Sequence, residues 1–270
     1  MGQINKMEVW NQLERMRTLV GKCEGRTKSA GISAIDHIVR AKALIEIDPQ
    51  MACFRAICAE EEAATSLLAS IKGQGYPQSE LIHLYSHPNK AAVIIFVAAV
   101  IDWFHKRFIA DGLHFGTPRL MFTDEPGRKA IELLLPLLGT DKAVHPRPPL
   151  DVRVENGATL QDMIGESVQL KLKQTLASEI KGAISVKANQ RNLLLYASDK
   201  NLPGLIAKPE QYVINQAGIV NALLTAVGMV DPWCKPNYPH SEVVKSAVLE
   251  FVRIMRAVDA SRKRNPAPTT

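Results

Sequence analysis

The strongest constraint on the fold is a helix that the sequence delimits at both ends. Asp48 places a short acceptor side chain directly before Pro49, an arrangement that favours the first turn of a helix. Gly73 and Gly75 then end the segment. Between these signals the apolar residues follow helical spacing, which predicts a helix with one buried face. The apolar stripe on that face is Phe54, Ile57, Cys58, Leu68 and Ile71.

Helical spacing of apolar residues continues through most of the 270 residues. Two amphipathic helices are expected before Asp48, and a strongly apolar helix is expected at residues 89 to 110. Thr123 is expected to cap a further helix that Pro136 kinks or ends, and Ser241 to cap the last one. The predicted fold is therefore all-α or mainly α, built as a helical bundle.

A proline-rich segment, residues 145–150, is the best candidate for a boundary within the chain, because closely spaced prolines favour an extended connector. Residues 1–144 are expected to form a helical bundle. Residues 151–270 are expected to be helical as well, either as a second domain or packed on the first half as one domain. Alternating apolar and polar residues near 151–173 also predict a small β-hairpin there.

The positive charge of the chain is concentrated at its two ends. The chain has 33 Lys and Arg against 27 Asp and Glu, a net charge of +6. Residues 1–45 hold eight basic and four acidic residues, and residues 245–270 hold six and two, so each end carries +4. Basic side chains on the last helix would form either an edge that contacts phosphates or a solvated helix end favoured by the helix dipole. The residues of this candidate nucleic-acid-binding edge are Lys245, Arg256, Arg262, Lys263 and Arg264.

The chain has the features of a cytoplasmic protein. Its four cysteines include no Cys-x-x-Cys pair and are too few for a small disulfide-stapled secreted fold. The N-terminus has charges where a signal peptide has its apolar stretch, and the most apolar run, residues 91–101, is too short to span a bilayer. The sequence lacks a phosphate-binding glycine loop, a zinc-protease motif and a serine-hydrolase elbow. Neither a cofactor nor a membrane partner is therefore expected.

Three consecutive glutamates, residues 60–62, interrupt the apolar stripe of the helix that begins at Pro49. Glu61 lies seven residues from both Phe54 and Leu68, which places it at the middle of the buried face and turns its neighbours about 100° to either side. An inward carboxylate has to be paired, protonated or bound to a metal, because an isolated buried charge costs too much free energy.

A partner for this carboxylate is expected on the next helix. Lys90 lies on the packed side near the start of that helix, and His87 lies three residues earlier on nearly the same side. Such a cluster would hold two helices together as a structural ion pair, bind a small anion at the helix N-terminus, or serve catalysis. The predicted buried polar cluster is Glu60, Glu61, His87 and Lys90.

Two carboxylate-x-x-histidine pairs, Glu80 with His83 and Asp102 with His105, have the spacing of metal ligands in di-iron helical bundles. A second bridging glutamate is not evident, and chance matches are unsurprising in a chain with seven histidines. No metal site is therefore favoured, and these four residues remain weak candidates.

The order of these motifs resembles a known family. AEEEAAT at residues 59–65 and SHPNKAAV at residues 86–93 are similar to elements of the helical HEPN-type domains, in particular the abortive-infection V-like proteins, over about residues 33–110. The resemblance implies a HEPN-like fold and a role in a prokaryotic stress or phage-defence system. Matched by position, the residues that it implies are Glu60 and Glu61 for the acidic pair, and His87 and Lys90 for the His-x-x-Lys element.

Many HEPN-type domains are ribonucleases with an Arg-x-x-x-x-His motif, which this sequence lacks; the nearest spacing is Lys235 before His240. The leading hypothesis is a binding or regulatory protein that contacts RNA or a protein partner. A nuclease or metal-dependent hydrolase, and a purely structural protein-interaction bundle, are the alternatives. The sequence leaves the oligomeric state open, and a homodimer is compatible with it.

Overall fold

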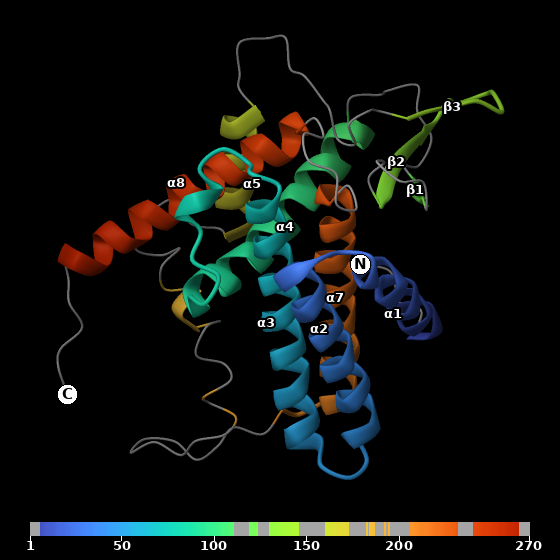
Figure 1. Cartoon of the computed structure of the whole chain (residues 1–270), viewed down its shortest axis with the longest axis vertical. Coiled ribbons are helices and arrows are strands. Elements are labelled where there is room, and N and C mark those ends of the chain that lie inside the picture. Colours follow the sequence, from blue (N-terminus) through green and yellow to red (C-terminus); the bar gives the residue numbers. More distant parts are fainter. Residues whose placement is uncertain are drawn as a thin grey trace. The chain divides into compact units, whose positions relative to one another are not determined.

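The structure, a computed structural model, is mainly helical with a small antiparallel sheet, which confirms the predicted fold class (Figure 1). It divides into two compact units, to which α3, α4 and α7 each contribute residues. Unit 1 comprises Met1–Ser70, Leu84–Ile94 and Ser185–Gly228, and unit 2 comprises Ile71–His83, Ile95–Ile184 and Met229–Thr270. The residues that the structure describes are 6–110, 119–123, 130–145, 160–172, 182, 184–186, 192, 194, 206–231 and 240–264.

Unit 1 is a bundle in which α2, α3 and α7 run side by side (Figure 1). The buried residues of α2 recur every three or four positions, from Thr27 to Ala41, so one face of this helix lies in the core. Asn221 of α7 donates a hydrogen bond to the carbonyl of Val9, which ties the first helix to α7. The helices that contribute to unit 1 are α1 (Lys6–Gly21), α2 (Gly25–Leu44), α3 (Pro49–Gly73), α4 (His87–Ala110) and α7 (Pro209–Val230).

Side-chain caps begin three helices, and those at Asp48 and Ser241 are the predicted ones. The Asp48 carboxylate accepts a hydrogen bond from the amide of Met51 at the start of α3, which ends at Gly73. The Ser86 hydroxyl faces the amide of Asn89 at 3.4 Å, at the start of α4. Ser241 is placed in the same way before the helix α8 (Glu242–Arg264), with its hydroxyl 3.4 Å from the amide of Val244.

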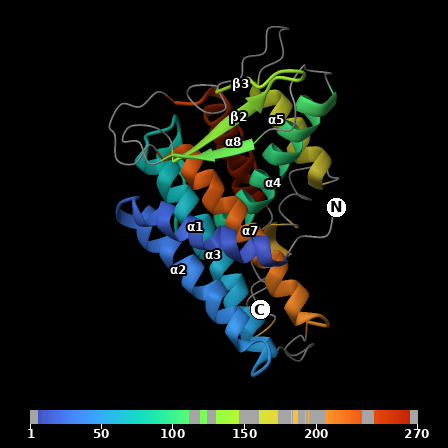
Figure 2. The ribbon, with the colours of Figure 1, turned by 90° about the vertical axis from the view of Figure 1, so that its right-hand side faces the viewer.

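Unit 2 combines helices with the sheet. In it α8 packs on α5, and Phe251 of α8 meets Phe96 of α4 edge to face, with ring centroids 5.7 Å apart. The sheet is antiparallel with β2 in the middle (Figure 2). Besides parts of α3, α4 and α7, the elements of unit 2 are η1 (Ser79–Leu81), β1 (Arg119–Phe122), β2 (Ile131–Pro136), β3 (Ala143–Val144), α5 (Leu160–Leu172) and α8.

Two predictions of local structure are wrong. The helix expected between Thr123 and Pro136 is contradicted by strand β2, which pairs with β1 and β3. Residues 124–129 of that expected helix lie outside the described part of the chain. The hairpin expected near 151–173 is contradicted by α5, which buries Ile164 and Val168 four residues apart on one helical face. Residues 151–155 of that hairpin, and residues 146–150 of the proline-rich connector, lie outside the described part of the chain.

Helix α7 is long and apolar enough to cross a membrane by length and composition. Its most apolar side chains, however, are buried within unit 1, among them Val213, Ala217 and Val220, each 0% exposed. This burial is that of a core helix.

Candidate functional site

The glutamates of α3 are arranged differently from the prediction. Glu60 is the buried carboxylate, 3% exposed, whereas Glu61 is only half-buried. Residues 63 to 71 of α3 are all buried, so the helix is covered on more than one side, whereas Phe54 and Cys58 of the predicted stripe are only half-buried. Glu60 lies on one of the buried rows, at spacings of three and four, which is Cys53, Ile57, Glu60, Ala64 and Leu67.

Glu61 and His87 are brought together as predicted. The Oε1 atom of Glu61 lies 3.3 Å from Nδ1 of His87, the first residue of α4. This ring nitrogen is buried, while the imidazole as a whole is 43% exposed and the Glu61 side chain 15% exposed. The carboxylate therefore lies beside a buried ring nitrogen without a hydrogen bond to it, while the rest of the imidazole remains accessible to solvent.

Lys90 enters the interior one turn further along α4. It is 8% exposed, so its aliphatic stem is part of the core of unit 1. Among the described residues no ion pair joins its ammonium to Glu60 or Glu61. The structure therefore supports a pair of Glu61 with His87. Lys90 is buried three residues after His87, but it is not part of that pair.

Helix α7 adds a tyrosine and a glutamine that sequence reasoning missed. Burial raises the pKa of the Tyr212 hydroxyl, the charge of Glu60 raises it further, and the nearby Gln216 acts in the opposite direction. Gln216 is 4% exposed and lies within the apolar stripe of α7. A polar residue inside an apolar stripe is the signal in the sequence that could have indicated this buried polar group. The Glu60 carboxylate thus lies close enough to α7 for its charge to act on Tyr212.

Glu61→Gln is expected to lower the free energy of unfolding by about 1 kcal/mol, because it removes the charge that faces His87 in a partly buried pair. Thermal and urea denaturation at neutral pH measure the change. Glu62→Gln is the control, since Glu62 is also half-buried on α3 and forms no ion pair with a described residue, although its charge raises the pKa of His37. Equal stability of the two variants would show that the Glu61–His87 pair does not stabilise the fold.

The weak metal candidates do not form a metal site in the described residues. Glu80 lies in the short helix η1 while Ile82 is already extended, so Glu80 and His83 do not share a helical face. Asp102 lies in α4, and the side chain of His105 is outside the described part. Across that part no group of three or more His, Cys, Asp or Glu could hold a metal ion.

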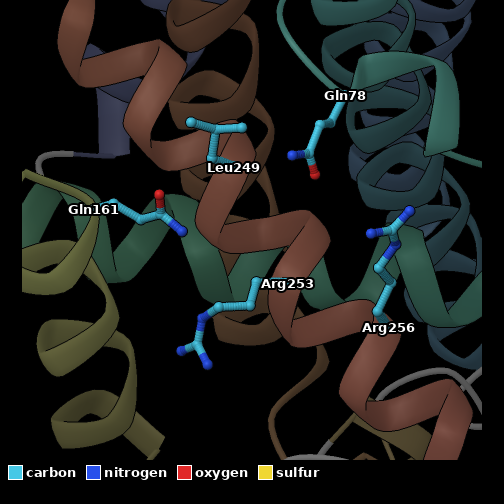
Figure 3. Close-up of a pocket in the computed structure, with 5 residues that line it drawn as sticks. All are labelled: Gln78, Gln161, Leu249, Arg253 and Arg256. Atoms are coloured by element: carbon cyan, nitrogen blue, oxygen red, sulfur yellow. The ribbon is translucent and has the colours of Figure 1, made fainter.

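A cleft along α8 in unit 2 gathers basic and amide side chains (Figure 3). It has a volume of about 370 Å³. Arg256 extends toward Gln78 on one side of α8, while Arg253 extends to the other side, where α5 carries Gln161. The residues that line this α8 cleft are Gln78, Gln161, Leu249, Arg253 and Arg256.

The two arginines of the α8 cleft are in different electrostatic states. Arg253 donates from Nε and Nη2 to the carboxylate of Glu250, at 2.7 and 2.5 Å, and this carboxylate is only 2% exposed. These hydrogen bonds raise the pKa of Arg253. Arg256 is exposed and makes no ion pair with any residue the structure describes. It is therefore the cation of the cleft that is available to a ligand.

The predicted basic edge is only partly described. Lys245 lies on the same side of α8 as Arg256, but its ammonium is 3.5 Å from the carboxylate of Glu242. The side chains of Arg262, Lys263 and Arg264, at the end of α8, lie outside the described part.

The loop that carries Gln78 is held against the start of α8. The ring of Tyr76 stacks on His240, with centroids 4.1 Å apart, and Nε2 of His240 donates to the carbonyl of Gln74 at 2.8 Å. Gln78 itself has left-handed backbone geometry, with φ of 62°. Burial raises the pKa of the Tyr76 hydroxyl to about 12. Sequence reasoning missed this contact because Tyr76 and His240 are far apart in the chain.

Comparison with known proteins identifies no relative. No family model matches the chain, and no curated protein or solved structure is similar enough to establish a relationship.

Proposed function

We propose that this protein is an RNA-contacting binding protein of the cytoplasm and a regulatory component of a prokaryotic stress or phage-defence system. The observation that carries RNA contact is Arg256, an exposed guanidinium in the α8 cleft with no acidic partner among the described residues. The defence setting rests on the resemblance of residues 33–110 to HEPN-type, abortive-infection V-like proteins.

The charge of α8 supports contact with a chain of phosphates. Lys245 and Arg256 lie on one side of the helix and span about 16 Å at 1.5 Å per residue. Cations at such intervals bind nucleic acid by displacing counterions from successive phosphates, which gives an affinity that falls as salt rises.

Arg256→Gln is expected to weaken binding of a fluorescein-labelled single-stranded RNA by about tenfold, because a hydrogen bond to a charged group contributes about 1.5–3 kcal/mol. The slope of log affinity against log salt should become shallower by about 0.7, which is the loss of one phosphate contact on a single strand. Fluorescence anisotropy across a salt series measures both quantities.

Lys142→Gln is the matched control, because it removes the same charge from an exposed position next to β3, where it does not line the cleft. It should leave the affinity and the salt slope unchanged. Wild-type protein that binds no RNA, or binds it independently of salt, contradicts the proposal and favours a structural protein-interaction bundle.

The Glu61–His87 pair favours one alternative, an RNA-cleaving enzyme. A carboxylate 3.3 Å from one ring nitrogen, as Glu61 is from His87, could orient an imidazole for acid–base chemistry once a hydrogen bond forms between them. Incubation of the same labelled RNA with the protein, with and without Mg²⁺, separates cleavage from binding on a denaturing gel. Shorter fragments that disappear with His87→Ala would favour the enzyme over the binding protein.

A further inference from the structure

The size of the α8 cleft suits one small ligand. Its volume of about 370 Å³ lies within the range of about 300–1,000 Å³ that is typical of small-molecule sites. Bases inside a double helix expose only their edges, whereas the unpaired bases of a single strand can leave the stack and enter a cleft. A single unpaired nucleotide therefore fits this site better than a duplex does.

The charge of the cleft suits a group with one negative charge. Glu250 neutralises Arg253, which leaves Arg256 as the uncompensated cation of the lining residues. A phosphodiester within an RNA chain carries one negative charge, whereas a terminal phosphate carries about −1.5 to −2 at neutral pH. The cleft thus favours a nucleotide inside a chain over a free nucleotide.

The remaining lining groups match the surface of a base. Gln78 and Gln161 each offer a carbonyl acceptor and an amide donor, the two kinds of group that pair with base edges. Leu249 supplies apolar surface, and Arg253 supplies a planar guanidinium on which a base can stack. The hydrogen bonds from Arg253 to Glu250 hold that guanidinium in a fixed orientation, although its side chain is 58% exposed.

We infer that the α8 cleft binds one unstacked nucleotide of a single-stranded RNA, with its phosphodiester on Arg256 and its base among Leu249, Gln78 and Gln161. The inference rests on the proposed function, since it names the form of RNA that the same site takes. The inference goes beyond the proposed function because a protein that contacts phosphates alone does not distinguish paired from unpaired bases.

The test compares three labelled ligands by fluorescence anisotropy at one salt concentration: a single-stranded RNA 10-mer, its blunt duplex, and the same strand made abasic. Full-length wild-type protein should bind the single strand about tenfold more tightly than either of the others, since base stacking alone contributes that much. Gln78→Ala should weaken single-strand binding about threefold to tenfold, with the salt slope and abasic-strand affinity unchanged. Gln211→Ala, which truncates an exposed amide on α7, is the matched control.

The outcomes separate this inference from the proposed function. Equal affinity for all three ligands, with Arg256→Gln still weakening each, overturns the nucleotide site and leaves RNA contact standing. Adenosine monophosphate that displaces the RNA more strongly than a dinucleotide phosphodiester does also overturns it, in favour of a free-nucleotide site. Absence of RNA binding overturns both proposals. Circular dichroism of each variant establishes that it is folded.

Discussion

Replacing Arg253 with methionine is expected to lower the free energy of unfolding by about 3 kcal/mol, because it leaves the Glu250 carboxylate buried without its counter-ion. Glu250 is 2% exposed, and both of its oxygens accept hydrogen bonds from Arg253. Methionine keeps part of the apolar stem of arginine, so the loss reports mainly on the charge pair. Urea denaturation followed by circular dichroism measures the change.

A surface ion pair provides the matched control. Arg17 and Asp36 are 2.9 Å apart, but their side chains are 35% and 45% exposed, so Arg17→Met should cost at most about 1 kcal/mol. Adding Glu250→Gln to the Arg253→Met variant should recover much of the lost stability, since a neutral amide needs no counter-ion. Equal losses for Arg253→Met and Arg17→Met would contradict the prediction.

The same pair connects the stability of unit 2 with its cleft. Gly165 of α5 lies so close to Glu250 that a Cβ built on it would be 2.6 Å from Oε1, so α5 and α8 approach closely here. Gln161, one turn earlier on α5, places its amide 3.5 Å from the other carboxylate oxygen. The buried carboxylate thus sets the position of two residues that line the cleft, Gln161 and Arg253.

Helix boundaries could be predicted from the sequence because their causes are local. Asp48 before Pro49 and Ser241 before α8 each act on an amide three residues further along the chain. The strands could not be predicted in this way. The apolar run of β2 is equally suited to a helix, and only its pairing with β1 and β3 decides the outcome.

In the candidate sites too, features set by nearby residues could be predicted from the sequence, and features set by distant segments could not. The pairing of Glu61 with His87 was predicted because both motifs lie on adjacent helices of a packed bundle. The burial of Glu60 instead of Glu61 was not predicted, since one residue on a helix turns the side chain by about 100° and α3 is covered on several sides. Arg256 was predicted from charge, whereas Gln78 and Gln161 reach the cleft from distant segments.

Gly31→Val is expected to lower the free energy of unfolding by about 3 kcal/mol, because α2 has no room for a side chain at this position. A Cβ on Gly31 would be 2.9 Å from Cγ1 of Val20 on α1 and 3.1 Å from Oγ of Ser66 on α3. Val20 is 0% exposed, and the Ser66 hydroxyl donates to the carbonyl of Thr27 at 2.7 Å, so both neighbours are held in place. The three helices would have to separate to admit the branched side chain.

Gly21→Val is the control, because it makes the same substitution in a helix at a position where the new side chain meets no neighbour. Gly21 is the last residue of α1, and a Cβ there would have no atom within 4 Å. Its replacement should change the free energy of unfolding by no more than about 0.5 kcal/mol. Gly31→Ala should fall between the two, because removing a glycine from a helix gains about 1 kcal/mol while the overpacking of one methyl costs about 1–3 kcal/mol. Urea melts that rank the variants in any other order would contradict a close approach of α1, α2 and α3 at Gly31.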